Sequence, residues 1–571
     1  MKCLKPHIKK NIGYLIFGPI MKMFETILEL CNPLLVAQIV DKGISSGSLS
    51  YILRYVMYIV VCNLLCFGFA VIGQKCSTLV STRVGTGLRR DLFSKVADFS
   101  HAELDKFGTA SLINRLTNDI FQIENAVGAF MRLLLRLPFY LVGSFVLSLI
   151  INPKMSLVFL VLIPVFGVVL YFYMKKTGPY YSKIRDKLDS VGKVTRENLS
   201  GTRVIRAFNK QEAEQTRFES VSDDYSKTCI RVSKISSLLH PFVLLVVNFS
   251  TIAILALGGW QIHIGNMSQG DVIALTDYVS IITISLLMLS QVIAMFVRTI
   301  ASIKRVNEVI YTEPSVKEKN TRKLTRLEYD ALMEFDNVCF NYSFDAKEKS
   351  FIKDLSFKIY PHQTIGIIGG TGSGKTTIAS LMTRFYDVTQ GKILYKGKDI
   401  KDFSLKQLRE EVSIVQQRSV LFSGSLRENM LLRNEKATDE EIIEALKISQ
   451  AWPFVSEWSN TLDYQIMAGG KNVSGGQMQR LTIARALINK PELLILDDSS
   501  SALDFMTEKN LRNELKKLDC ALVLISQRAT SIQRADLIIV LDNGDVVGMG
   551  KHKDLLENCE IYREIYESQS K

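Results

Sequence analysis

The chain has 571 residues, of which 47% are hydrophobic, and a formal net charge of +13. Its nine cysteines are scattered and include no C-x-x-C pair, which gives neither a disulfide framework nor a zinc site and fits a reducing cytosolic face. The basic excess would suit nucleic acid, but loops between apolar segments hold many of the lysines and arginines. These loops explain the charge without a nucleic-acid partner.

Six apolar runs in the first half of the chain are long enough to cross a bilayer. They are predicted at Tyr14–Val40, Ile52–Gly73, Arg136–Ile151, Met155–Met174, Pro241–Ile262 and Val272–Val297. The third run is short, so its helix is expected to begin well before the membrane. Three connections are brief and almost uncharged, whereas the other loops are long and rich in lysine and arginine. The positive-inside rule therefore predicts a multi-pass protein of the cell membrane with both termini and both long loops in the cytoplasm.

The long loops are polar and helix-compatible, so the membrane helices are expected to continue beyond the bilayer. Four polar side chains share one face of the first span, at spacings of three, four and three: Lys22, Glu25, Glu29 and Asn32. Ionisable residues within a membrane are costly and face a cavity or a partner. Two interpretations of these four residues are open. In one, Lys22 extends its ammonium toward the membrane surface and pairs with Glu25. In the other, the four residues line a translocation pathway that prefers cations.

Two arginines on the third helix weaken the cation preference. Arg132 and Arg136 lie four residues apart and are placed to neutralise the acids of the first span. On the last span, three further polar residues are candidates for lining the same cavity: Asp277, Tyr278 and Gln291.

From about Glu334 the chain alternates short apolar strands with charged helical segments, the pattern of a soluble α/β domain. The stretch "GGTGSGKTT" follows the apolar strand "TIGII" and precedes the predicted helix "IASLMTRF". This stretch has the P-loop pattern, and its position between a strand and a helix supports that interpretation. Its glycines let backbone N–H groups close around phosphates at a helix N-terminus. The predicted nucleotide-binding residues are Gly369, Gly370, Thr371, Gly372, Ser373, Gly374, Lys375, Thr376 and Thr377.

Within this loop, Lys375 is predicted to reach the terminal phosphates of the nucleotide and Thr376 to ligate Mg²⁺. Asp497 ends the apolar strand Leu493–Leu496 and is the natural partner acid for that magnesium. A mere Gly/Ser-rich turn is the alternative, and the Gly-Lys-Thr sequence argues against it.

One stretch indicates the family. "NVSGGQMQRLTIARAL", Asn472–Leu487, lies just upstream of the Asp497 strand and resembles the signature motif of ATP-binding cassette (ABC) proteins. Val473 stands where leucine is usual and Met478 where a basic residue is common. Small residues before a helix would offer bare N–H groups to an anion, and the residues expected to meet ATP are Ser474, Gly475, Gly476 and Gln477.

Six spans followed by one cassette resemble an exporter-type half-transporter. This resemblance covers nearly the whole chain and implies an α-helical six-span transmembrane domain at 1–305, a linker at 306–333 and an α/β nucleotide-binding domain at 334–571. Phe107–Ile120 and Arg196–Glu214 are similar to the two cytoplasmic loops of such exporters. The second similarity implies that a short tip helix, expected at Phe208–Glu212, docks on a partner's nucleotide domain.

The resemblance also implies roles within the cassette. Tyr342 would stack on the adenine of ATP, and Gln417 would contact magnesium and sense the transmembrane domain. Ser501–Asp504 would communicate between two nucleotide sites. Two positions depart from the catalytic pattern: Asp498 stands where the general-base glutamate is expected, and Gln527 where a histidine is expected.

The shorter acid retracts its carboxylate by about 1 Å, and misplacement of that size can cost roughly a hundredfold in rate. An amide in place of an imidazole removes positive charge offered to the γ-phosphate. The sequence therefore predicts a site that binds ATP and hydrolyses it slowly. It also predicts a heterodimer with a second half-transporter, with a slow homodimer as the alternative.

Hydrophobic or amphipathic small molecules, as in multidrug export, are the predicted substrates, with lipids or peptides as alternatives. A cassette ATPase without a transport role, as in translation or DNA repair, is argued against by the six apolar runs. A channel or receptor gated by ATP is the stronger rival, because gating needs binding more than turnover.

Overall fold

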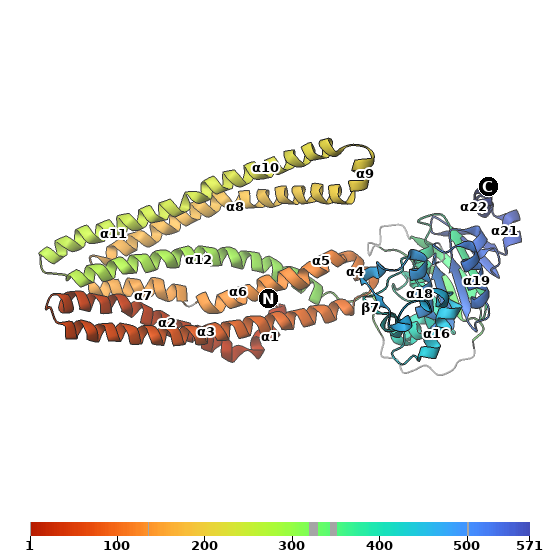
Figure 1. Cartoon of the computed structure of the whole chain (residues 1–571), viewed down its shortest axis with the longest axis horizontal. Coiled ribbons are helices and arrows are strands. Elements are labelled where there is room, and N and C mark those ends of the chain that lie inside the picture. Colours follow the sequence, from red (N-terminus) through yellow and green to blue (C-terminus); the bar gives the residue numbers. More distant parts are fainter. Residues whose placement is uncertain (1, 135, 319–328, 343–350, 500–501, 571) are drawn as a thin grey trace. The chain divides into compact units, whose positions relative to one another are not determined.

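The computed structural model describes residues 2–134, 136–318, 329–342, 351–499 and 502–570. The chain forms two compact units, one made of Met1–Ala97 and Ala110–Thr312 and the other of Asp98–Thr109 and Glu313–Lys571. The second unit is therefore built mainly from the C-terminal part of the chain, together with a short segment that interrupts the first (Figure 1).

The first unit is helical. Its described elements are η1 (Lys2–Leu4), α1 (Lys5–Lys10), α2 (Ile12–Gln38), η2 (Ile39–Ile44), α3 (Leu49–Ala97), α5 (Thr109–Asn114), η3 (Arg115–Asp119), α6 (Ile120–Leu133), α7 (Arg136–Ile151), α8 (Ser156–Ser200), α9 (Thr202–Ala207), α10 (Gln211–Ser237), α11 (Leu239–His263) and α12 (Gln269–Ile310). Among the described residues, six helical segments are long and apolar enough to cross a membrane, at Ile12–Ile44, Leu49–Ala97, Thr109–Ile151, Ser156–Ser200, Gln211–His263 and Gln269–Ile310. Five of them contain a predicted span entirely, and the fourth contains all of its predicted span except the first residue, Met155, so these six predictions are confirmed.

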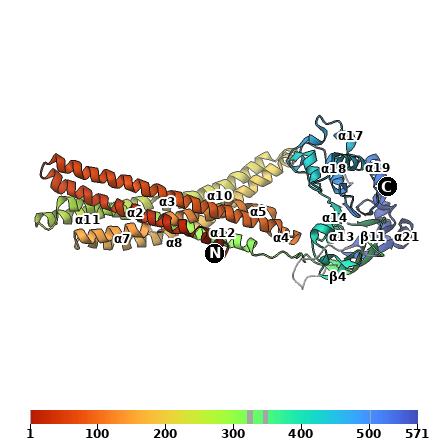
Figure 2. The same cartoon turned by 90° about the horizontal axis from the view of Figure 1, so that it is seen from below.

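Several helices extend far beyond their apolar runs, as the helix-compatible loops predicted. The third span is preceded by α5, η3 and α6, so its helix does begin well before the apolar run. Helices α2 and α3 lie side by side (Figures 1 and 2). The predicted linker 306–333 begins inside α12 and ends at the first residue of β1 (Met333–Phe340); the three-part division of the chain stays a prediction.

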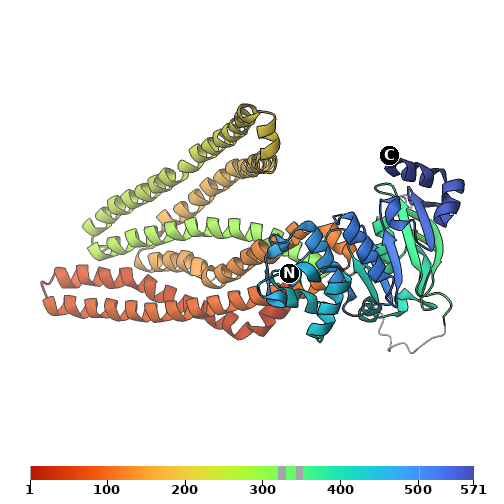
Figure 3. The same ribbon diagram turned by 45° about the vertical axis from the view of Figure 1, so that its right-hand side comes forward.

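The hairpin formed by α8, α9 and α10 corrects one prediction. The short helix at its tip is Thr202–Ala207, whereas Phe208–Glu212 contains the turn after it and the start of α10. Asn209 has a φ of 51°, a left-handed conformation that ends a helix and that asparagine tolerates. Figures 1 and 3 show this tip standing away from α3 and α5 of the same unit.

The second unit contains two main sheets. The strands are β1, β2 (Ile352–Ile359), β3 (Thr364–Gly369), β4 (Gln390–Tyr395), β5 (Lys398–Asp399), β6 (Val412–Val415), β7 (Gly424–Ser425), β8 (Gln465–Ile466), β9 (Leu493–Asp497), β10 (Ala521–Ile525), β11 (Leu537–Asp542) and β12 (Asp545–Gly550). One sheet has the order β12-β11-β3-β10-β9-β6 and is parallel except for β12, and the antiparallel sheet has the order β2-β1-β4-β5. This α/β architecture is the predicted one.

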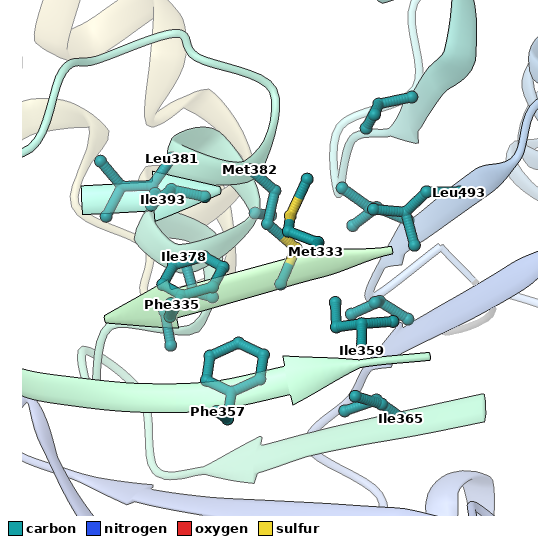
Figure 4. Close-up of a cluster of buried hydrophobic side chains, with 14 of the residues drawn as sticks. Met333, Phe335, Phe357, Ile359, Ile365, Ile378, Leu381, Met382, Ile393 and Leu493 are labelled. Carbon is teal, nitrogen blue, oxygen red and sulfur yellow. The ribbon is translucent and has the colours of Figure 1, made fainter. Parts of the chain in front are cut away.

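The helices of this unit cover the sheets and form a helical region beside them. They are α4 (His101–Phe107), α13 (Lys375–Met382), α14 (Leu405–Glu411), α15 (Leu426–Leu431), α16 (Asp439–Ile448), α17 (Trp452–Val455), α18 (Gly475–Leu487), α19 (Phe505–Leu515), α20 (Ala529–Ile532), α21 (His552–Asn558) and α22 (Glu560–Ser570). Figure 4 shows Ile378 and Met382 of α13 packed with Met333 and Phe335 of β1. This core fixes α13, and with it the loop that precedes it, against both sheets.

Candidate nucleotide-binding site

The parallel sheet brings the predicted site residues to one edge. Strand β3 ends at Gly369, β9 at Asp497 and β10 at Ile525, and Asp497 is paired in register with Ile525. Ligands bind at the carboxyl ends of parallel strands because the connecting loops and helix N-termini converge there. The P-loop, both adjacent acids and the segment that carries Gln527 therefore lie at this edge.

The P-loop has the backbone geometry that its glycines predict. Gly372 and Gly374 have φ values of 83° and 104°, a region that favours glycine. A side chain at Gly369 would meet the carbonyl oxygen of Leu541 at 2.2 Å. The Lys375 ammonium donates to the carbonyl oxygens of Gly369 at 2.8 Å and Gly370 at 2.6 Å, so it is held over the loop where phosphates would bind.

Asp497 and Thr376 meet as predicted for a magnesium site. Asp497 is 2% exposed, and burial raises the pKa of its carboxyl above the usual range while a hydrogen bond with Thr376 opposes that rise. Burial also lowers the pKa of Lys375, against the opposing charges of Asp497 and Asp498. One hydroxyl and one carboxylate fit Mg²⁺, which takes few protein ligands and completes its shell with phosphate and water oxygens. Among the described residues, no group of three or more His, Cys, Asp or Glu side chains is suited to hold a metal without such help.

Asp498 stands directly after β9 with a φ of 44°. Gln417 Nε2 donates to its Oδ2 at 3.3 Å, so the structure brings together two of the three predicted catalytic residues. Burial raises the pKa of Asp498, and the hydrogen bond from Gln417 and the charge of Arg528 oppose the rise. The third residue, Gln527, is exposed after β10, and its carbonyl accepts from Gln569 Nε2 at 2.7 Å.

Tyr342 lies beside the first turn of α13. Its hydroxyl is 2.8 Å from the Thr377 hydroxyl, and its ring meets Phe340 and Tyr386 edge to face, with centroids 4.8 and 5.4 Å apart. Tyr342 is partly exposed, and burial raises the pKa of its hydroxyl. A half-exposed ring next to the P-loop helix fits the predicted adenine platform; that role stays a prediction.

Sequence reasoning missed that α4 packs against this aromatic cluster. The His101 ring stacks on Phe385 with centroids 4.2 Å apart, and the Tyr386 hydroxyl donates to Asp105 at 2.6 Å. Burial and the charge of Arg409 lower the pKa of His101, while Asp105 opposes the shift. The S-x-x-E capping box that begins α4, at Ser100 and Glu103, was a readable signal for a short helix here.

The signature segment has the predicted helix N-terminus. Ser474 caps α18, accepting from the N–H of Gln477 at 3.2 Å while its own N–H donates to the Gln477 side chain at 2.9 Å. Gly475 and Gly476 form the first turn of the helix rather than preceding it. A side chain at Gly475 would point into open space, whereas one at Gly476 would approach the carbonyl oxygen of Ala502 at 3.0 Å. In the predicted Ser501–Asp504 loop, Ser501 lies outside the described residues.

The polar residues of the first span form a charge cluster. Lys22 Nζ lies 2.7 Å from Glu25 Oε2, and Arg136 contacts Glu25 at 3.2 Å and Glu29 at 3.0 Å. Two cations thus face two carboxylates. The Lys22–Glu25 pair considered from the sequence is formed, and Arg136 neutralises the acids as expected.

The remaining candidate pathway residues differ in their surroundings. Asn32 donates to Asn63 Oδ1 at 3.1 Å, whereas Asp277 and Gln291 are exposed on α12. Tyr278 is fully buried and donates to the Leu30 carbonyl at 2.9 Å, which makes it part of the packing between α12 and α2.

Comparison with known proteins agrees with this architecture. The family described as ABC transporter transmembrane region matches residues 15–286, and the ABC transporter family matches residues 352–501. The chain is 34% identical over 550 residues to an uncharacterized ABC transporter ATP-binding protein, YfiB, of Bacillus subtilis (strain 168), covering 96% of this chain and 95% of the relative. It is 30% identical over 573 residues to the ATP-dependent lipid A-core flippase of Haemophilus influenzae (strain 86-028NP), covering 100% of this chain and 97% of the relative.

The fold has a solved counterpart. A bacterial Atm1-family ABC exporter with ATP bound superposes with a TM-score of 0.80 at 22% identity, covering 99% of this chain and 100% of that one. Six membrane-type helical segments and a P-loop cassette with a signature helix are therefore present in one polypeptide. This chain belongs to the ABC transporter family and has the fold of an exporter half-transporter.

Proposed function

We propose that the chain is one subunit of an ATP-driven exporter that works with a different half-transporter. Its own P-loop site binds ATP and hydrolyses it slowly. Its signature residues, Ser474–Gln477, complete the active site of the partner, where most hydrolysis takes place. The active site is thus shared between two chains, in the cell membrane, with both termini of this chain in the cytoplasm.

The contrast within one site supports this proposal. The groups for binding are assembled, with Lys375 over the loop and Thr376 hydrogen-bonded to Asp497. The residue after β9 is Asp498, one methylene shorter than glutamate, and it is hydrogen-bonded to Gln417. Gln527 follows β10 with an amide that offers no positive charge to a phosphate. The site of this chain thus keeps the groups that bind ATP, whereas the groups that would hydrolyse it quickly are altered.

In this mechanism, magnesium supplies charge stabilisation to the phosphates when it is bound. Thr376 and Asp497 are the residues of this chain that would hold it. Lys375 exchanges its bonds to the Gly369 and Gly370 carbonyls for nucleotide phosphates. Gln417 orients the Asp498 carboxylate, and Tyr342 offers its exposed ring to the adenine.

Hydrophobic or amphipathic molecules are the proposed substrates. The two carboxylates of the first span are balanced by Lys22 and Arg136, so the cluster removes the preference for cations. Asn32, Asp277 and Gln291 then supply the remaining polar groups along the proposed pathway. The relative named as a lipid A-core flippase is aligned over the whole of this chain, which supports an amphipathic substrate.

The proposal is tested by ATP hydrolysis of the purified full chain, alone and with its partner subunit. We expect little hydrolysis by the chain alone and restoration on mixing. Robust hydrolysis by the chain alone that Lys375→Ala abolishes would refute the shared site. Uptake by vesicles containing both subunits distinguishes a pump from an ATP-gated channel, because only a pump accumulates substrate against its gradient.

A further inference from the structure

The segment that follows β10 carries Gln527 and is held through its backbone. The N–H of Ser526 donates to the carbonyl of Ile367 in β3 at 3.1 Å, and the Ser526 hydroxyl accepts from the N–H of Arg528 at 3.0 Å. Ser526 is 4% exposed, whereas the Gln527 side chain is exposed. The direction in which the Gln527 side chain points therefore depends on the bonds made by the backbone around it.

One side chain from another helix adds two bonds to this segment. Gln569 of α22 donates from Nε2 to the Gln527 carbonyl at 2.7 Å, and its Oε1 accepts from the N–H of Ala529 at 2.8 Å. Ala529 is the first residue of α20, and the N–H groups in the first turn of a helix have no acceptor within that helix. The Gln569 amide thus supplies one donor and one acceptor to the two backbone groups that flank Arg528.

Helix α22 is anchored in the cassette unit by a buried tyrosine. Tyr562 is fully buried, and its hydroxyl lies 2.8 Å from Nδ1 of His552. It belongs to an apolar cluster that contains Ile368 of β3 and Ala529 of α20. This cluster joins α22 both to the strand that leads into the P-loop and to the helix that follows Gln527. The exposed amide of Gln569 therefore extends from a packed helix.

The pair of bonds does more than cap a short helix. Capping of α20 requires only an acceptor for the N–H of Ala529. The second bond, to the Gln527 carbonyl, adds nothing to that helix, because Gln527 lies before α20 begins. It acts instead on the residue that follows β10 at the edge where the P-loop and Asp497 meet. Two bonds from one planar amide fix both the position and the direction of this piece of backbone.

We propose that Gln569 is a positioning residue for the nucleotide site, which holds the backbone on both sides of Arg528 and so keeps the Gln527 side chain directed at the terminal phosphate of ATP. Gln569 acts through this backbone and not by touching the nucleotide. The inference rests on the proposed function, in which Gln527 faces a phosphate of the bound nucleotide. It makes α22 part of the machinery that distinguishes ATP from ADP, because only ATP carries the terminal phosphate.

The test measures equilibrium binding of two nucleotides to the full chain in detergent, with Mg²⁺ present. One is ADP, and the other is an ATP analogue with an imido bridge between its β- and γ-phosphates, which is not hydrolysed. Gln569→Met keeps the length of the side chain and removes both hydrogen bonds without adding charge. We expect the affinity for the analogue to fall roughly fivefold, the factor that one hydrogen bond contributes. The affinity for ADP should stay unchanged.

A double-variant cycle tests whether Gln569 acts through Gln527. Gln527→Ala should lower the affinity for the analogue by a similar factor. Adding Gln569→Met to Gln527→Ala should cause no further loss, because residues that act through one another are not additive. Glu567→Ala is the matched control, since Glu567 is exposed on the same helix and alanine is a good helix former. Both of its nucleotide affinities should equal those of the unaltered chain.

Three results would overturn the proposal: an equal loss of affinity for ADP and for the analogue in Gln569→Met, a further loss in the double variant, or an equal effect of Gln569→Met and Glu567→Ala. The first would show that Gln569 supports only the fold of the cassette. None of these measurements involves ATP hydrolysis or a second subunit, so they succeed or fail separately from the shared-site proposal.

Discussion

Replacing Asp498 with asparagine tests whether this acid is a working general base. Asp498 has a φ of 44°, a left-handed conformation that asparagine adopts readily, and its N–H donates to the Ile525 carbonyl at 2.9 Å. Gln417 donates to its carboxylate at 3.3 Å, and asparagine keeps an oxygen for that bond. The variant therefore removes charge and basicity while the backbone and its contacts remain.

The expected magnitude follows from the length of the side chain. A carboxylate retracted by about 1 Å already costs roughly a hundredfold in rate, so this site adds little to a dimer whose other site is complete. We expect Asp498→Asn to lower total hydrolysis by at most about threefold, under ~1 kcal/mol of barrier. Loss of a competent base costs roughly a hundredfold or more, about 2.7 kcal/mol.

The assay is steady-state hydrolysis by the two-subunit transporter with saturating ATP and magnesium. Asp519→Asn is the matched control, since Asp519 is an exposed acid away from the site. Changing the partner's catalytic glutamate to glutamine should cause the hundredfold loss. If Asp498→Asn causes a loss of that size instead, Asp498 is a competent base and the two sites are close to equivalent.

Three further predictions concern groups that the structure places in or beside the site. Lys375→Ala should lower the ATP affinity of the purified chain at least about tenfold, because a charge-assisted phosphate contact is lost; equilibrium nucleotide binding measures this. Ser474→Ala and Gly475→Glu should remove most hydrolysis by the two-subunit transporter, the second by placing an anion where phosphate belongs, and near-normal turnover would show that the signature is not catalytic. The pKa of His101 is lowered on folding, so its contribution to docking of α4 is complete above about pH 6.5 and is lost as pH falls below that value. The protection factors of the α4 amides, which correct hydrogen exchange for its intrinsic pH dependence, should therefore fall on acidification, and His101→Phe, which keeps the stacked ring, should flatten the response.

The sequence predicted those parts of the fold and site that depend on local chemistry. Membrane spans follow from apolar length, and the P-loop follows from glycines and Lys375 at a strand-to-helix junction. Local signals also predicted a helix N-terminus at the signature segment, where Ser474 caps α18. The tip helix was placed about six residues too late, because α9 has no side-chain cap to mark its start and Gly201 precedes it.

Some contacts between distant segments carry no signal in the sequence. Asp105 and Tyr386 are 281 residues apart in the chain, and no local pattern indicates that α4 joins the cassette unit. The same holds for Arg418 and Arg485, which come from separate elements and line one groove only in the folded unit. The Arg136 contact with the first span was foreseeable, because two acids buried in a bilayer require a cation.

One chain can keep an intact signature motif and still have an altered acid at Asp498 if the two act on different nucleotide sites. In the proposed dimer, the N-terminus of α18 faces a nucleotide held by the partner. Ser474 and Gly475 must therefore still support fast hydrolysis of that nucleotide. Asp498 and Gln527 act only on nucleotide bound to this chain's own P-loop, where tight binding suffices. Asp498→Asn and Ser474→Ala therefore have opposite expected outcomes in the two-subunit transporter: the first leaves most of the hydrolysis, and the second removes most of it.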